Sequence, residues 1–161
     1  NTCSVMAQYW KNTDEIEIAV ADSGVGIHNT LSDKYNTKSV YDSISLAMEP
    51  GISRVDIEKS VGNWGNTGFG LYLLSGVGKE YGHFSILSSG TYIKRYELNE
   101  KTLCDDNIFF KGTALKIKVK RSSLDYFPNL LEKLIRDGQQ LYEDRTGKKI
   151  KASGMSRKSL H

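Results

Sequence analysis

Two segments far apart in the chain alternate apolar with polar or small side chains, at the period of a β-strand. Residues 16–21 read Ile-Glu-Ile-Ala-Val-Ala, and residues 115–120 read Leu-Lys-Ile-Lys-Val-Lys. This alternation gives each strand one apolar face, as in an antiparallel sheet that packs helices against one side only. It therefore constrains the chain to a sheet with one covered face.

Turn residues and the spacing of apolar residues divide the rest of the chain into elements. Strands are predicted at residues 5–11, 15–22, 83–88, 91–98, 108–110 and from 113 onward, with a polar turn over 99–107. Helices are predicted at residues 40–48, at 69–81 and from Pro128 onward, the last with an inner face of Leu130, Leu131, Leu134, Ile135 and Leu141. This order of strands and helices predicts an α+β fold, a two-layer α/β sandwich with a mixed, mostly antiparallel sheet and helices on one face.

The length of 161 residues fits one domain. Residues 1–122 are predicted to form this domain, residues 123–144 a C-terminal helix packed on or near it, and residues 145–161 a disordered basic tail. The tail holds six basic and no acidic residues, so the remaining 16 basic and 19 acidic residues leave the domain and helix a net charge of −3. Because the tail has no aromatic residue to stack on bases, a nucleic-acid partner is not favoured.

Cysteine content and hydropathy bear on the compartment. The two cysteines, Cys3 and Cys104, cannot build a disulfide framework, so a reducing, cytoplasmic setting is expected. No run of residues approaches the ~20 apolar residues of a membrane span, and no signal-peptide segment opens the chain. No membrane partner is expected.

Seven of the fifteen glycines lie between Gly62 and Gly82, around the start of the helix predicted at 69–81. Glycine lets a backbone approach a ligand closely, and the start of a helix attracts anions, so this segment is a candidate phosphate site. A flexible surface loop would have the same composition, and both interpretations stay open here. The sequence matches neither the P-loop spacing nor GxGxxG, and its three histidines lack a zinc-binding spacing.

Three segments carry the remaining chemistry. Residues 16–27 (IEIAVADSGVGI) place Asp22 at a strand end, just before two glycines. Residues 66–74 (NTGFGLYLL) form a glycine-rich loop that runs into a helix, and residues 112–119 (GTALKIKV) open a late strand with a Gly-Thr step. Together they supply a fixed acceptor for a base and a set of backbone N–H groups for phosphates.

These three segments resemble, in this order, the GHKL superfamily of ATPase domains, which includes gyrase B, the heat-shock chaperone, histidine kinases and MutL. The closest resemblance is to stand-alone bacterial histidine-kinase-like ATPase proteins, in which segments similar to VMAQYW and SISLAMEPGIS also recur. The resemblance covers about two-thirds of the chain. It implies a Bergerat-type fold and an ATP-binding domain of a bacterial regulatory or signalling protein, with ATP or ADP as the cofactor. A nucleotide-dependent interaction module without turnover is the alternative.

The resemblance also implies a role for individual residues. Asp22 would accept a hydrogen bond from the adenine amine, Gly24 and Gly26 would let the base lie against the backbone, and Thr113 would support the carboxylate. The backbone N–H groups expected at the phosphates are those of Asn66, Thr67, Gly68, Phe69, Gly70 and Leu71. Taken without the resemblance, Asp22 is also a plausible former of an Asx turn and Thr113 an ordinary strand residue.

Cations and the magnesium site are less well defined. Lys34, Lys38 and Arg54 lie in the expected ATP lid, where they would contact phosphates or simply be solvated. The family's N-box helix, whose Asn binds Mg²⁺ and whose Glu activates water, has no counterpart in the four residues before the first strand. Because the chain begins at Asn1 rather than Met, we expect a fragment or a processed product.

The missing N-box has three expected consequences. No catalytic residue or metal ligand can be assigned, Mg²⁺ is expected only with the missing Asn, and this chain alone is predicted to be inactive. Sheet surface that the missing helix would cover is expected to be exposed or filled by another chain. The expected partner besides the adenine nucleotide is a regulatory protein or another domain of the full-length protein.

Overall fold

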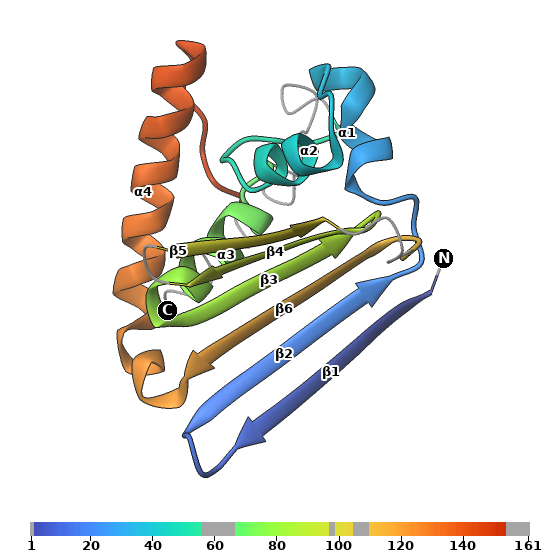
Figure 1. Ribbon diagram of the computed structural model, residues 1–161. Helices are drawn as coiled ribbons and strands as arrows, with labels where there is room; N and C mark the ends of the chain where they lie inside the picture. The colour runs from blue at the N-terminus through green and yellow to red at the C-terminus, as the bar shows by residue number, and fades with distance from the viewer. Residues whose placement is uncertain (1, 56–66, 97–98, 105–109, 154–161) are drawn as a thin grey trace.

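A six-stranded antiparallel sheet forms one layer of the protein (Figure 1). The computed structural model describes residues 2–55, 67–96, 99–104 and 110–153. The strands are β1 (Cys3–Trp10), β2 (Glu15–Asp22), β3 (Gly82–Ser88), β4 (Thr91–Tyr96), β5 (Asn99–Cys104) and β6 (Thr113–Lys120), in the spatial order β1-β2-β6-β3-β4-β5. All pairings between these strands are antiparallel, so the expected mixed sheet is wrong for the described residues.

The alternating segments of the sequence lie side by side as β2 and β6. Their register places Ile16, Ile18 and Val20 of β2 opposite Val119, Ile117 and Leu115 of β6. Beyond β6, Leu115 is opposite Ile86 of β3. Because side chains at alternate positions share a face, this register gives the sheet one continuous apolar side.

Helices form the second layer, on that apolar side (Figure 1). They are α1 (Ile27–Tyr35), α2 (Val40–Ala47), α3 (Gly70–Tyr81) and α4 (Phe127–Thr146), with a 3₁₀-helix, η2 (Arg121–Tyr126), before α4. The Ser39 side chain caps α2 by accepting the Asp42 N–H at 3.0 Å, and proline in the first turn suits the start of α4. The predicted helices at 40–48, at 69–81 and from Pro128 are confirmed.

Within the described residues, the core has three parts that meet at α3, one of which is formed by Val77, Val119 and Leu130. Ile44 and Met48 of the α2 region pack on Phe84, Ile86 and Ile93 of β3 and β4. The second part joins α3 to α4 and to the segment after α4, through Phe69, Leu73, Leu131, Ile135 and Ala152. Fully buried apolar side chains of this size each contribute roughly 1.5–3 kcal/mol to folding, so these contacts hold the helices on the sheet.

Three segments differ from the sequence prediction: residues 99–104, Phe110 and the unpredicted helix α1. Residues 99–104, expected in a turn, form β5, and Phe110, expected in a strand, lies outside any strand; residues 108 and 109 lie outside the described residues. An edge strand with polar side chains lacks the apolar alternation on which the prediction depends. Helix α1 lies in a stretch that is mostly polar, where Leu31 is its one fully buried residue.

The C-terminal region also differs. Leu141, expected on the inner face of α4, is half-exposed, because this part of α4 lies beyond α3 (Figure 1). The helix continues to Thr146, and the following residues to 153 are irregular but packed, with Ala152 only 1% exposed. The described part of the expected disordered tail is therefore folded against the domain.

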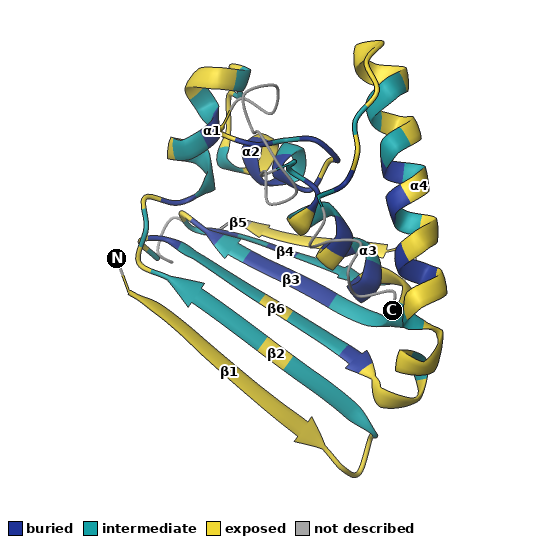
Figure 2. Cartoon of the chain, turned by 180° about the vertical axis from the view of Figure 1, so that it is seen from behind, coloured by how far each residue is buried: buried dark blue, intermediate teal, exposed yellow. Residues whose placement is uncertain are grey.

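The helical layer does not extend over the β1 edge of the sheet (Figure 2). Every residue of β1 is exposed, and Ile18 of β2 is 41% exposed although its side chain is on the helix-facing side. This agrees with the expectation that some apolar sheet surface is exposed. Among the described residues, no helix combines the length and the apolar character that crossing a membrane requires.

Candidate functional site

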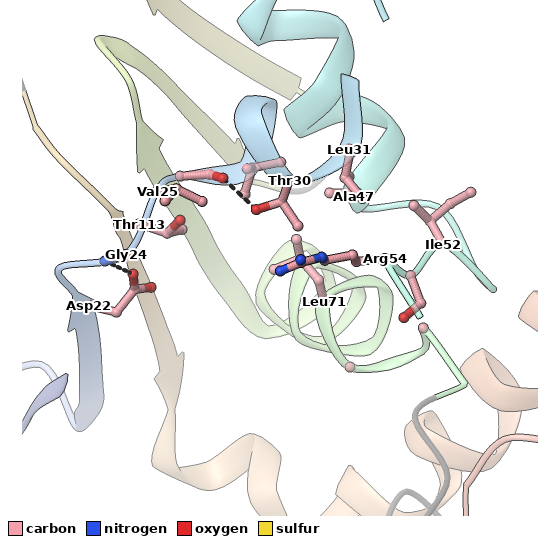
Figure 3. Close-up of a pocket in the computed structure, with 15 residues that line it drawn as sticks. Asp22, Gly24, Val25, Thr30, Leu31, Ala47, Ile52, Arg54, Leu71 and Thr113 are labelled. Atoms are coloured by element: carbon pink, nitrogen blue, oxygen red, sulfur yellow. Dashed lines mark hydrogen bonds between the residues drawn. The ribbon is translucent and has the colours of Figure 1, made fainter. Parts of the chain in front are cut away.

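A cavity of about 510 Å³ opens between the ends of β2 and β6, the first turns of α1 and α3, and the segment after α2 (Figure 3). Its volume lies within the range in which proteins bind small molecules. The described residues that line it are Asp22, Gly24, Val25, Gly26, Ile27, Thr30, Leu31, Ala47, Ile52, Ser53, Arg54, Gly68, Gly70, Leu71 and Thr113. All three motif segments of the sequence therefore contribute to one cavity.

Asp22 stands at one end of this cavity, as the last residue of β2 and directly opposite Thr113, the first residue of β6. Its Oδ1 atom accepts the Gly24 N–H at 2.7 Å, so the Asx turn is present (Figure 3). The described residues donate no hydrogen bond to the second oxygen, Oδ2. Asp22 thus combines the turn with a carboxylate oxygen that remains available to a ligand.

A buried serine that the sequence analysis did not single out fixes this end of the cavity. Ser88, at the end of β3, is fully buried. Its hydroxyl donates to the Gly112 carbonyl at 3.0 Å and accepts the Ile27 N–H at 3.0 Å, which connects the Gly-Thr step to the start of α1. A single serine after an apolar strand carries no motif, so sequence reasoning had no signal by which to find it.

The backbone conformation at residue 112 explains why the residue before Thr113 is a glycine. Its φ of +121° lies in the left-handed region, and a Cβ there would collide with the carbonyl group of Asp22. The end of β2 and the start of β6 can therefore approach each other this closely only because residue 112 has no side chain. That close approach places Thr113 beside Asp22 at the cavity.

The other end of the cavity is the start of α3. No side chain caps this helix, and its first turn contains no acidic residue. Its first N–H groups have no partner within the helix, and the helix dipole adds positive potential there, so the position favours an anion. A Cβ added to Gly70 would meet no atom within 4 Å, which shows that the space beside this first turn is open.

Arg54 adds the cation that the cavity needs for an anionic ligand. It lines the cavity with Gly70 and Leu71, and Figure 3 shows its guanidinium extending into this space. Lys34 at the end of α1 does not line the cavity; its ammonium donates to the Ser53 carbonyl at 2.9 Å, and the Tyr35 hydroxyl donates to the same carbonyl at 3.0 Å. Lys34 and Tyr35 therefore hold the segment that carries Arg54.

The structure brings most of the predicted site residues to the cavity: Asp22, Gly24, Gly26, Gly68, Gly70, Leu71 and Thr113. Phe69 does not line it, because its side chain is 1% exposed and packs in the core with Leu73 and Leu131. Thr67 is also outside the lining, and its Oγ1 atom accepts the Ser153 N–H at 3.2 Å. Asn66 lies outside the described residues, as do residues 56–65, whereas Lys34, Lys38 and Arg54 of the expected ATP lid are described.

Sequence reasoning missed the apolar wall of the cavity. Val25, Ile27, Leu31, Ala47 and Ile52 come from α1, α2 and the segments that flank them. In the sequence these residues are indistinguishable from core residues, because an apolar side chain at helical spacing predicts burial whether it faces the core or a cavity. Only the arrangement of the elements distinguishes the two.

The two histidines among the described residues, His28 and His83, do not line the cavity. The Nδ1 atom of His28 is 2.7 Å from the Ser43 hydroxyl, which joins α1 to α2. His83 lies on β3, where burial and then the nearby Lys94 lower its pKa from the ordinary value. No group of three or more His, Cys, Asp or Glu side chains in the described part of the chain is placed to hold a metal ion.

Comparison with known proteins does not add to this picture. No protein-family model matches the chain, and no curated protein sequence matches it significantly.

Proposed function

We propose that the protein binds an adenine nucleotide, ATP or ADP, in this cavity, as the ATP-binding domain of a histidine-kinase-like GHKL ATPase with a Bergerat-type fold. One observation carries the proposal. The carboxylate of Asp22, beside Thr113, and the uncapped start of α3 with its open Gly70 line the same cavity. A regulatory or signalling role in a bacterial cell is part of this proposal.

The chemistry of the cavity matches the parts of such a ligand. Asp22, Ile27 and Leu31 line the cavity. The Oδ2 atom of Asp22 would accept a hydrogen bond from an exocyclic amine, while Ile27 and Leu31 would contact a flat ring. The start of α3 and Arg54 favour the phosphates at the other end. Guanine presents a carbonyl where adenine presents its amine, so guanine nucleotides should bind poorly.

The same residues do not fit a magnesium site. Among the described residues that line the cavity, Asp22 is the single carboxylate, and no Asn or Gln side chain joins it. Mg²⁺ needs oxygen ligands near the phosphates, whereas Asp22 lies at the end assigned to the base. This observation favours the second candidate function, an interaction module that binds a nucleotide and changes its affinity for a partner without turnover.

The proposal is tested by calorimetric titration of the chain with ATP, ADP and GTP. Replacement of Asp22 by Asn should weaken adenine nucleotide binding by ~1.5–3 kcal/mol, the range for a hydrogen bond to a charged group. The asparagine oxygen can still accept the Gly24 N–H, so the turn and the thermal stability should persist. Asp33→Asn, an exposed change on α1 outside the cavity, is the control. Unchanged ATP affinity in Asp22→Asn would contradict the assignment.

A further inference from the structure

The two edges of the sheet differ in chemistry. The edge strand β5 has six residues and includes Glu100 and Lys101, with Glu100 paired to Arg95 at 2.6 Å. The edge strand β1 has eight residues, Cys3–Trp10, and contains neither a charged residue nor a proline. Charges and prolines are the usual means by which proteins prevent an edge strand from pairing with another chain. The β5 edge is protected in this way, and the β1 edge is not.

The backbone of β1 presents hydrogen-bonding groups along its outer side. In the β1–β2 register, Thr2 is opposite Ser23, and the Ser23 N–H donates to the Thr2 carbonyl at 3.1 Å. Hydrogen-bonded pairs alternate along an antiparallel ladder, so the even-numbered residues of β1 bond to β2. The outward-facing residues are therefore Cys3, Val5, Ala7 and Tyr9. Within the described residues, no strand lies beyond β1.

The phase of this alternation has an independent check on the other side of β2. There the Arg121 N–H donates to the Asp14 carbonyl at 2.8 Å, so even-numbered residues of the β2 segment bond toward β6. Odd-numbered residues of β2 are thus left to bond to β1, which agrees with the pairing of Thr2 and Ser23.

Side chains on both faces of β1 are apolar and accessible. Val5 and Tyr9, on the helix-facing side, are 66% and 49% exposed, and Met6 and Trp10, on the other side, are 75% and 43% exposed. Exposed apolar residues are ordinary when scattered, but here they lie on one strand beside unpaired backbone groups. A strand added beside β1 would cover part of the apolar side chains on both faces.

We propose that two copies of this chain pair through β1, antiparallel and about a two-fold axis, and so join their sheets into one. Such a pair is self-complementary, because each outward N–H of one copy meets a carbonyl of the other. With Ala7 on the axis, Val5 lies opposite Tyr9 of the other copy, and outward-facing residues pair only with outward-facing residues. The helical layers then lie on the same side of the joined sheet.

Charge supports a second copy as the occupant. Residues 2–10 are uncharged, so no charge faces its own copy near the axis. With Ala7 on the axis, Lys11 comes beside Cys3 of the other copy, and Cys3 is opposite Asp22 within its own sheet. A cation at one end of the strand thus approaches an anion at the other end, twice in each dimer. This inference does not depend on nucleotide binding.

The experiment measures the mass of the full chain by light scattering and sedimentation over a wide range of concentration. Wild type should show a monomer–dimer equilibrium. Ala7→Lys, which places two like charges at the axis, should raise the dimer dissociation constant by roughly tenfold or more. Ala7→Pro should do the same, because proline removes an outward N–H and is tolerated at a strand edge. Thr102→Lys, the same added charge on β5, is the matched control and should leave the equilibrium unchanged.

Amide hydrogen exchange along β1 supplies the second readout. The amides of Ser4, Met6 and Gln8 should be protected at every concentration, whereas those of Val5, Ala7 and Tyr9 should become protected only as the dimer forms. A chain that stays monomeric at all concentrations overturns the proposal. So does a dimer that both Ala7 variants leave intact, or one in which the odd-numbered amides still exchange freely. If Ala7→Pro fails to fold, Ala7→Lys decides.

Discussion

Gly68 and Gly70 are two residues apart in the glycine-rich segment, and the structure holds them in different conformations. Gly68 has a φ of +69°, and a Cβ there would collide with the backbone of Ile52. Gly70 is the first residue of α3, and the space beside it is open. Gly68 is thus required by the fold, whereas Gly70 leaves room at the cavity. In the sequence both residues belong to the predicted phosphate loop, and nothing in the pattern separates a glycine required by the fold from one that leaves room at the cavity.

This difference predicts opposite outcomes for the same substitution. Gly70→Val should leave the melting temperature of the ligand-free chain nearly unchanged and abolish its stabilisation by ATP, because the side chain enters the cavity. Gly68→Val should destabilise the ligand-free chain by about 1–3 kcal/mol, the cost of forcing a side chain into a left-handed conformation. Thermal unfolding with and without ATP measures both effects. If ATP stabilises Gly70→Val as strongly as wild type, the start of α3 does not bind the phosphates.

Glu15, at the start of β2, gives a prediction for acid stability. Hydrogen bonds from Lys118 and then Thr13 lower its pKa from 4.5 to about 2. A carboxyl group whose pKa is lowered by folding contributes stability above its unfolded value, and this contribution is lost as the pH falls from 4.5 toward 2. The melting temperature of Glu15→Gln should therefore be below that of wild type at neutral pH, with the difference vanishing near pH 2. Glu132→Gln, exposed on α4, is the control, and a difference independent of pH would refute the prediction.

At the residue scale, the sequence predicted the residues that line the cavity better than the residues that hold them in place. Asp22 and Gly26 belong to a visible pattern, a carboxylate followed by glycines at a strand end, whereas Thr113 was expected at the site only from the resemblance of its Gly-Thr step. Ser88, which connects two of the motif segments, was not found, since its role depends on two backbone groups that are distant in sequence. Any residue type can supply the backbone group in such a hydrogen bond, so the sequence does not show which residues are paired.

At the scale of elements, the segment after α4 is part of the site's support. The Gln139 side chain donates to the Ile150 carbonyl at 2.9 Å, and Ala152 is buried against the cluster that contains Phe69. The Ser153 N–H then bonds to Thr67, three residues before α3 begins. This segment read as a disordered tail because its basic composition hides two apolar residues, Ile150 and Ala152, that anchor it.

Removal of this segment should loosen the start of α3. A chain ending at Gly147 should show faster amide exchange at residues 69–72 without nucleotide, and a several-fold weaker affinity for ATP. A chain ending at Ser153 keeps the contacts and is the matched control, which should resemble the full chain in both measurements. Unchanged exchange in the shorter chain would show that the segment only covers the core.

The elements that sequence reasoning identified are those with a strong apolar period. Strand β2 was predicted at its observed bounds, and α2 and α3 within one residue, because each has apolar side chains at a regular spacing. Strand β5 and helix α1 were missed, since one lies at a sheet edge and the other is mostly polar. Tertiary contacts, such as the pairing of β5 with β4, decide the structure where local preference is weak.

At the scale of the whole molecule, the two layers follow from the sequence pattern, whereas the neighbours of each strand do not. The alternation in β2 and β6 predicted one covered face. It did not predict that the helices leave β1 exposed, because that depends on where α1 and α2 pack. The cavity likewise depends on this packing, since the described residues of its walls come from five separate elements, β2, α1, α2, α3 and β6.

The composition of the cavity predicts that this chain alone turns over ATP poorly. Phosphoryl transfer depends on a metal ion and on positioning of the attacking group, and the described lining residues include no carboxylate besides Asp22. ATP affinity should depend little on magnesium, and phosphate release should stay near background with or without it. Sustained magnesium-dependent release that Asp22→Asn abolishes would show that the chain itself holds a metal ligand.

The position of β6 between β2 and β3 has a consequence for how the chain folds. Two parts of the sheet, β1–β2 and β3–β4–β5, are each continuous in sequence, but neither contacts the other except through β6. Residues 113–120 are synthesised after the other strands. Until they are available, the edges of β2 and β3 that pair with β6 stay unpaired. Such long-range pairing slows folding and exposes strand edges to other nascent chains. The late strand carries charged side chains that oppose its aggregation before it pairs with β2 and β3, namely Lys116, Lys118 and Lys120.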